Sequence, residues 1–183
     1  MLVRRPDTDG IILCRLEAEV FEASINYFTG SSEIFIRRFS HSSLADSFDT
    51  KALLNQGDCV LKCLESLKKE YGDISYGKEK FSPDEMYWIG YTHRFFCLTY
   101  GVSSLQAFKI LKPKDMRNVY YPYHTMDCSQ AIARMLETRG RTLDEKELEE
   151  RFKSIYRRML KEEKAQEKLR RKEKKARPAL FSQ

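Results

Sequence analysis

Residues 117–124, RNVYYPYH, place Arg117 and His124 at the two ends of a run that is rich in tyrosine. An arginine binds anionic oxygens through a planar fork of donors, and a histidine transfers protons near neutral pH. The segment therefore has three interpretations. It is a chemical site, a surface that binds a partner, or an aromatic turn that closes a helical core.

The catalytic interpretation follows from a resemblance. An arginine followed at short spacing by a histidine is similar to the signature of the HEPN ribonucleases, which are helical proteins, and Asn118 also suits that family. The resemblance implies that Arg117 stabilises the charge of a phosphorane while His124 helps to move the 2′-OH proton. Pro122 departs from it, because the motif of those enzymes runs along a helix that proline would break.

The two other interpretations require no chemistry. In the structural one, Arg117 caps a helix over residues 114–120 and the tyrosines pack a turn against the core. In the other, the segment binds a protein, since tyrosine and arginine dominate the binding energy of many interfaces. The predicted partner-binding residues are Arg117, Tyr120, Tyr121, Tyr123 and His124, with Arg37 and Arg38 as secondary candidates.

Arg37 and Arg38 lie within FIRRFSHSS, residues 35–43, whose apolar members predict a core-facing side. The arginines would then stand on the rim of that side. We expect them to form salt bridges with Asp46 or Asp49, or to receive an acidic partner or a phosphate group.

His93 and Cys97 stand one helical turn apart, a spacing that would suit a cysteine nucleophile and its base. Both belong to a very apolar segment, and no orienting Asp or Asn is evident. A thiol buried in apolar surroundings has a raised pKa and is inert. We therefore expect both side chains to pack in the core.

The five cysteines include no CxxC pair, and Cys59 and Cys63 have no further ligands nearby in the sequence. Four-coordinate zinc needs such ligands, so no metal is expected. Glycine-rich phosphate loops and common hydrolase motifs are absent from the sequence, so no cofactor is expected either. Polar side chains are predicted to stay outside the core and not to converge.

The composition is that of a globular protein, with 42% hydrophobic and 12% aromatic residues. No apolar run approaches the ~18 residues that a membrane span needs, so we expect a cytoplasmic protein. The net charge of +6 is uneven. Residues 161–177 hold nine Lys or Arg and four Glu, which leaves the rest of the chain at +1.

Three capping boxes mark helix starts: Ser82–Glu85, Ser103–Gln106 and Thr142–Glu145. Gly72, Gly101 and Gly140 mark helix ends. Helices are predicted over 12–28, 32–46 with a break near Ser40, 57–71, 83–100, 103–111, 114–120, 128–139 and 144–176, with a turn over residues 7–10.

The predicted fold is an all-α, compact helical bundle around a central buried helix, 83–100, with a long basic C-terminal helix. Apolar residues line two sides of helix 83–100, which is typical of a helix surrounded by others. Gly90 in its middle predicts that another helix crosses closely there.

The predicted domains are a globular body over residues 1–143 and a C-terminal helix over residues 144–183. An apolar seam would dock the first half of that helix, and the basic second half would project or fray. The second half is a solvated charged helix, a segment that folds on a protein, or a nucleic-acid-binding arm. The arm would use Lys168, Arg170, Arg171, Lys172, Lys174 and Lys175.

Three stretches resemble an uncharacterised bacterial family associated with toxin–antitoxin-like operons. They are EAEVFEASINYFTGSSEIFIRRFSHSSLADSFD (17–49), EMYWIGYTHRFFCLTYGVSSLQAFKILKPKDMRNVYYPYHTMD (85–127) and CSQAIARML (128–136). The resemblance implies a small helical protein that is encoded beside an ADP-ribosyltransferase-like toxin and acts with it. His93-Arg94 stands where an aromatic-rich stretch is typical, which implies a different local surface.

We therefore expect a non-enzymatic component that binds a protein, as an antitoxin or regulatory partner of a co-encoded toxin. A HEPN-like ribonuclease using Arg117 and His124 is one alternative. An RNA- or DNA-binding protein using the basic tail is the other. The oligomeric state is left open.

Overall fold

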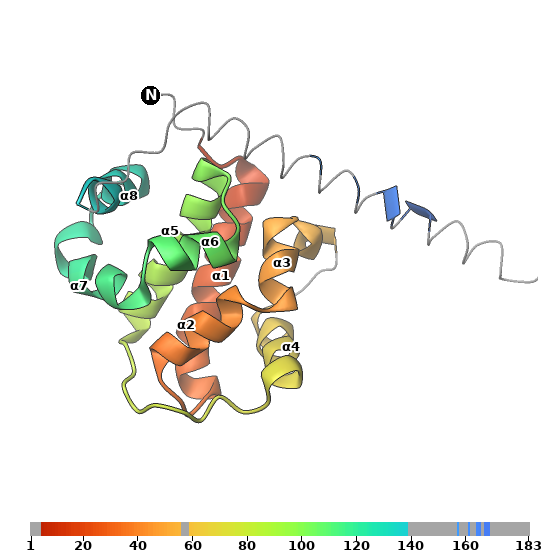
Figure 1. Cartoon of the computed structure of the whole chain (residues 1–183), viewed down its shortest axis with the longest axis horizontal. Helices are drawn as coiled ribbons and strands as arrows, with labels where there is room; N and C mark the ends of the chain where they lie inside the picture. Colours follow the sequence, from red (N-terminus) through yellow and green to blue (C-terminus); the bar gives the residue numbers. More distant parts are fainter. Residues whose placement is uncertain are drawn as a thin grey trace, which may run out of the picture.

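The computed structural model describes residues 5–55 and 59–138, and beyond them the separate positions Arg157, Lys161, Lys164, Ala165, Glu167 and Lys168. Every regular element in this part of the chain is helical, which confirms the all-α class. The elements are α1 (Thr8–Tyr27), α2 (Ser32–Ser40), α3 (Ser43–Asp49), a short 3-10 helix η1 (Ala52–Asn55), α4 (Val60–Tyr71), α5 (Pro83–Tyr100), α6 (Ser104–Ile110), α7 (Pro113–Tyr123) and α8 (Cys128–Glu137) (Figure 1).

The core forms around the pair α1 and α5, which lie side by side in the middle of the bundle (Figure 1). The other helices surround this pair, with α7 and α8 on one side and α3 and α4 on the other. Met86, Ile89 and Phe96 of α5 are at most 1% exposed. Burying each such side chain is worth about 1.5–3 kcal/mol, so α5 is the central buried helix that the sequence predicts.

Gly90 allows α1 and α5 to approach closely. A Cβ atom at this position would lie 2.8 Å from the carbonyl oxygen of Glu17 and 2.9 Å from the Cα of Ala18. Real Cβ atoms do not come so near backbone atoms. The predicted close crossing at Gly90 is confirmed, and the helix that crosses there is α1.

The predicted caps of α5 and α6 are present in full. The Ser82 hydroxyl accepts the Glu85 N–H, and the Glu85 carboxylate accepts the Ser82 N–H. Ser103 and Gln106 form the same reciprocal pair at the start of α6. Gly101 ends α5 with φ of 60°, a left-handed conformation that favours glycine.

The predicted start of the first helix differs from the structure, whereas the predicted break near Ser40 is present. The helix predicted from residue 12 begins at Thr8, because the Asp7 carboxylate accepts the Gly10 N–H at 2.8 Å and caps α1. Residues 8–10 therefore belong to the helix and not to a turn. The expected break near Ser40 is real, and α3 starts anew with Ser42 as its N-cap.

The helix predicted over 114–120 is longer than expected, because α7 runs through Pro122 to Tyr123. Pro122 lacks only the N–H that would donate to the carbonyl of Asn118, an exposed residue, and the next residues continue the turn. The His124 N–H donates to the Tyr120 carbonyl at 2.8 Å. A proline in the last turn therefore did not end the helix where the sequence suggested.

The predicted C-terminal helix and the boundary at residue 143 lie outside the continuously described ranges, as do Thr142–Glu145 and Gly140. Of the predicted nucleic-acid-binding residues only Lys168 is described, and it is exposed. None of the helices that the structure describes combines the length and the apolar character needed to cross a membrane.

Candidate functional site

Tyr120, Tyr121 and His124 come together at the end of α7 and form one aromatic surface with Trp88 of α5. The Tyr120 and His124 rings stack with centroids 4.8 Å apart, and Trp88 meets Tyr120 edge-on at 5.7 Å. Tyr121 packs edge-on against His124 at 6.1 Å and is 85% exposed. We call Trp88, Tyr120, Tyr121 and His124 the α7 aromatic cluster.

Acidic side chains border the α7 aromatic cluster. Partial burial, with the carboxylates of Asp84 and Glu85, raises the pKa of Tyr120, so its hydroxyl stays protonated and neutral. Both carboxylates belong to the first turn of α5. The surroundings therefore favour a neutral or basic partner over an anionic one.

His124 is held by the helix that it ends. Its Nδ1 lies 3.2 Å from the Tyr120 carbonyl and 3.0 Å from the Tyr121 carbonyl. A carbonyl only accepts, so Nδ1 is the protonated donor nitrogen. This bond and the Tyr120 stacking fix the ring on the exposed end of α7.

Arg117 forms its contacts outside the α7 aromatic cluster. Its guanidinium forms ion pairs with Glu79 and with Glu85, the latter at 3.2 Å, and lies 4.6 Å above the Phe81 ring. Although partial burial opposes the charge, these hydrogen bonds raise the pKa of Arg117. Arg117 therefore attaches α7 to the loop 72–82 and to the start of α5. It does not cap a helix end, and its hydrogen-bond partners differ from those of His124.

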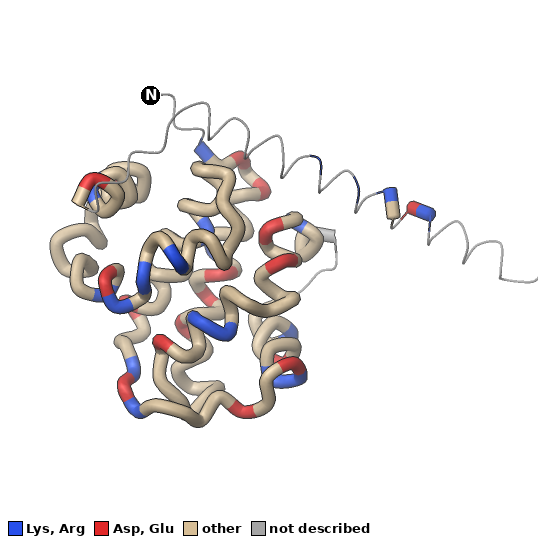
Figure 2. The backbone as a smooth tube through the Cα atoms, viewed as in Figure 1, with Lys and Arg blue, Asp and Glu red and all other residues tan. Residues whose placement is uncertain are grey.

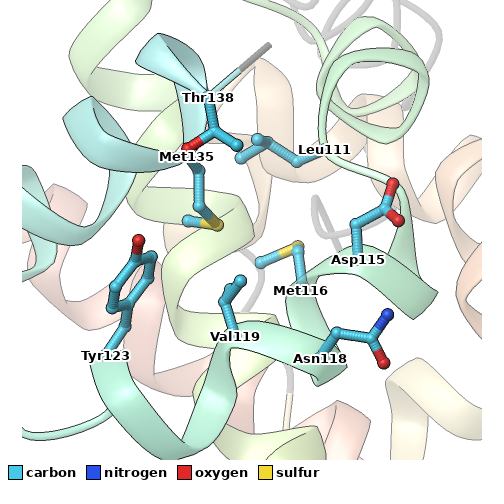
Figure 3. Close-up of a pocket in the computed structure, with 8 residues that line it drawn as sticks. All are labelled: Leu111, Asp115, Met116, Asn118, Val119, Tyr123, Met135 and Thr138. Atoms are coloured by element: carbon cyan, nitrogen blue, oxygen red, sulfur yellow. The ribbon is translucent and has the colours of Figure 1, made fainter.

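Tyr123 lines a cavity of about 560 Å³ between α7 and α8 (Figure 3). Met116 and Met135 approach each other across this cavity from the two helices (Figure 3). The other lining residues are Leu111, Asp115, Asn118, Val119 and Thr138. The predicted aromatic surface is thus divided between two sides of α7.

Arg37 and Arg38 have different surroundings on α2. Arg37 is exposed, and no ion pair to it is found among residues 5–55 and 59–138. Arg38 donates to the Tyr71 carbonyl at 3.4 Å and lies 5.7 Å from the Tyr71 ring. The expected salt bridge of this pair to Asp49 is wrong, because Asp49 binds Arg94.

Arg94 lies in the centre of the bundle, although its guanidinium is charged. It is 0% exposed, and it donates through Nε to Glu17 at 2.6 Å and through Nη1 to Asp49 at 2.7 Å. Nη2 donates to the Ser104 hydroxyl at 2.6 Å. Burial alone would lower the pKa of Arg94, but the Glu17 and Asp49 carboxylates raise it above the ordinary value.

His93, beside Arg94 on α5, joins the same network. Its Nδ1 lies 2.5 Å from a Glu17 carboxylate oxygen, and its Nε2 lies 3.1 Å from the Ser104 carbonyl. Both partners are acceptors, so each ring nitrogen needs a proton unless Glu17 carries one. An imidazolium would leave two cations, His93 and Arg94, balanced by the two carboxylates Glu17 and Asp49.

The prediction that polar groups stay outside the core is therefore wrong. Glu17, Asp49, His93, Arg94 and Ser104 converge inside it, and the expected surface at His93-Arg94 is buried. The cluster is nevertheless closed. Apart from Asp49, whose side chain is 9% exposed, its ionisable members are at most 2% exposed. It holds α1, α3, α5 and α6 together and presents no opening to a substrate.

Burial keeps the cysteine thiols near this network protonated. Burial raises the pKa of Cys97 well above its ordinary value and that of Cys14 from 9.0 to about 12. His93 and Cys97 are 1% and 3% exposed, which confirms the expected burial of both in the core, and the ring nitrogens of His93 bind Glu17 and the Ser104 carbonyl. Among the residues that the structure describes, no group of His, Cys, Asp and Glu could hold a metal ion.

Comparison of the chain with family models, with curated proteins and with solved structures finds no match.

Proposed function

We propose that this protein is a non-enzymatic binding component whose contact surface is the α7 aromatic cluster. The observation that carries the proposal is the exposure of Tyr121, 85%, next to the stacked rings of Tyr120 and His124. Such rings offer a large contact area, and packing already limits the side-chain freedom of Tyr120 and His124.

The partner that best suits this surface is a protein with a neutral or basic contact region. Asp84 lies beside the aromatic rings and would repel a polyanion there, whereas the charge of Glu85 is paired with Arg117. The resemblance to the bacterial family of toxin–antitoxin-like operons suggests which protein this is. We propose a co-encoded toxin, which this chain masks as an antitoxin or regulatory partner.

Co-purification tests this function. The product of the gene adjacent to the one for this chain is expressed with it, and the complex should survive high salt, because aromatic contacts are not screened. Tyr121→Ala should weaken the complex at least about tenfold, the effect of a residue worth more than ~1.4 kcal/mol. Tyr76→Ala is the matched control, since Tyr76 is 75% exposed on the loop 72–82.

Two results would refute the proposal. One is a neighbouring product that is harmless alone or fails to associate with this chain. The other is an equal effect of the Tyr121 and Tyr76 substitutions on affinity, which would move the contact away from α7.

A further inference from the structure

The near neutrality of the folded body hides an uneven distribution of charge. Many of its carboxylates bind cations or backbone groups of the same chain, some in the core and others at the surface. Glu17 and Asp49 bind Arg94, Glu79 and Glu85 bind Arg117, Asp73 binds Lys68, and Asp7 binds Lys51. Cations without such partners therefore set the charge of the surface where they gather.

Three exposed cations stand on segments that pack against each other: Arg37 on α2, and Lys109 and Lys112 at the α6–α7 junction. Across residues 5–55 and 59–138, no ion pair to any of them is found. The Lys and Arg positions of α2 and of this junction lie near one another at the front of the view in Figure 2. We call these three residues the basic face.

Aromatic contacts hold the basic face together. The His41 ring, at the end of α2, packs edge-on against Phe108 of α6 with centroids 5.8 Å apart. Lys112 places its Nζ 5.2 Å from the centre of the same Phe108 ring. His41 also donates from Nδ1 to the Arg37 carbonyl at 2.8 Å, so the end of α2 is fixed beside α6.

Further charges in the same segments leave the region positive. Arg38 and Lys114 add two cations, whereas Glu33, one turn before Arg37, and Asp115 are the carboxylates. Glu70 lies beside Tyr71, which binds Arg38, so five cations stand against three carboxylates. The face is also poor in apolar anchors, because Phe108 is flanked by His41 and Lys112.

We propose that the basic face binds the phosphate backbone of a nucleic acid without reading its bases. A protein interface is usually anchored by large apolar or aromatic side chains in pockets, and the basic face offers no such anchor. Phosphate contacts need none, because the release of counterions drives them. This inference is independent of the proposed function, since the α7 aromatic cluster is a different and acidic surface.

The test measures fluorescence anisotropy with the full chain. The probes are a labelled single-stranded RNA of about 20 nucleotides and a duplex DNA of about 20 base pairs, each of mixed sequence. This length exceeds the ~4–16 nucleotides that a single OB fold covers. Three phosphate contacts predict an affinity that falls about 20- to 40-fold between about 50 and about 200 mM salt. The probe bound more tightly identifies the form of nucleic acid.

The variant Arg37→Gln, Lys109→Gln, Lys112→Gln should weaken binding at least about tenfold at low salt and reduce the salt slope by about two to three. The control Lys62→Gln, Lys69→Gln, Lys78→Gln removes the same charge from exposed positions elsewhere. It should change affinity much less. Circular dichroism melting of both variants verifies that the fold is intact.

Four outcomes would overturn the proposal. The first is that neither probe binds at low salt. The second is that the two triple variants lose affinity equally. Alternatively, Lys168→Gln, Arg170→Gln, Arg171→Gln abolishes binding while the basic-face variant does not, which assigns the contact to the tail. Competition by poly-glutamate at equal charge, as effective as unlabelled RNA, would show that the face binds acidic proteins instead.

Discussion

Glu17 and His93 are 76 positions apart in the sequence, yet their side chains meet in the core, 2.5 Å from carboxylate oxygen to Nδ1. The second oxygen of Glu17 accepts from Arg94, the next residue of α5. One carboxylate thus connects α1 to two neighbouring cationic or protonated groups of α5. Gly90 lets the two helices approach closely, which brings Glu17 within reach of His93 and Arg94.

Replacement of Glu17 by Gln should strongly destabilise the protein. The amide keeps the shape of the side chain but removes the charge that balances Arg94, which is 0% exposed. Breaking a buried ion pair by removing one partner costs about 3–5 kcal/mol. Urea unfolding followed by circular dichroism measures the loss. Glu19→Gln, on the exposed side of α1, is the control and should change little.

Equal unfolding free energies for these two variants would show that the buried network contributes nothing to stability. A second readout is more specific. With glutamine at position 17, His93 needs only one proton, because the amide nitrogen can donate to Nδ1. The ¹⁵N chemical shifts of the imidazole in the variant should therefore be those of a ring with one N–H, whichever of His93 and Glu17 carries the shared proton in the natural chain.

Replacement of Gly90 by Ala should destabilise the protein, although the same change in an exposed helix stabilises it by about 1 kcal/mol. The added Cβ would lie 2.8 Å from the Glu17 carbonyl oxygen, so α1 and α5 must separate. Overpacking of this kind costs about 1–3 kcal/mol. Ser66→Ala on the exposed side of α4 serves as the control in thermal unfolding, and a higher melting temperature for Gly90→Ala would contradict the close crossing.

Local signals in the sequence predict most of the helical architecture. Ser82 and Glu85 mark the start of α5 because a cap depends on residues three apart, which a sequence displays directly. Gly90 predicts a helix crossing for a similar reason. Pro122 misled the prediction of α7, because the cost of proline depends on whether the carbonyl that loses its donor can reach water.

The buried network was missed because its members come from four segments, and no local rule pairs them. One signal was available in each of two helices. Glu17 lies on the buried stripe of α1 with Leu13, Cys14 and Phe21, and a charge on an apolar stripe requires a partner. Arg94 likewise stands within a helix that is apolar on two sides. Each signal indicates that a partner exists, but neither identifies it.

The buried thiols should make the protein less stable in alkaline solution. Burial raises the pKa of Cys14 and of Cys128 from 9.0 to about 12. Above pH 9 the unfolded chain loses these protons while the folded chain keeps them. The folded state then binds more protons, so the free energy of unfolding falls as pH rises from about 9 to about 12. Raised pKa values of Tyr91 and Tyr100 act in the same direction.

Melting temperatures between pH 7 and pH 11 measure this effect. The double variant Cys14→Ala, Cys128→Ala should show a smaller decrease with pH than the natural chain, whatever its stability at neutral pH. Cys59→Ala is the control, because Cys59 is exposed. An unchanged pH dependence in the double variant would show that these thiols do not link folding to proton binding.

Arg117 should act through the loop 72–82. Its guanidinium pairs with Glu79 of that loop and lies over Phe81, so Arg117→Gln removes an ion pair and a cation–π contact at once. Together these contacts are worth about 1 kcal/mol, which corresponds to an about fivefold more frequent opening of the loop. Lys78 is exposed in the same loop and offers a trypsin site. Trypsin should therefore cleave after Lys78 about five times faster in the variant, as followed by mass spectrometry.

Arg37→Gln is the control, because it removes an arginine outside the contacts of the loop, and it should leave the cleavage rate unchanged. Equal cleavage rates in the two variants would mean that Arg117 does not hold the loop.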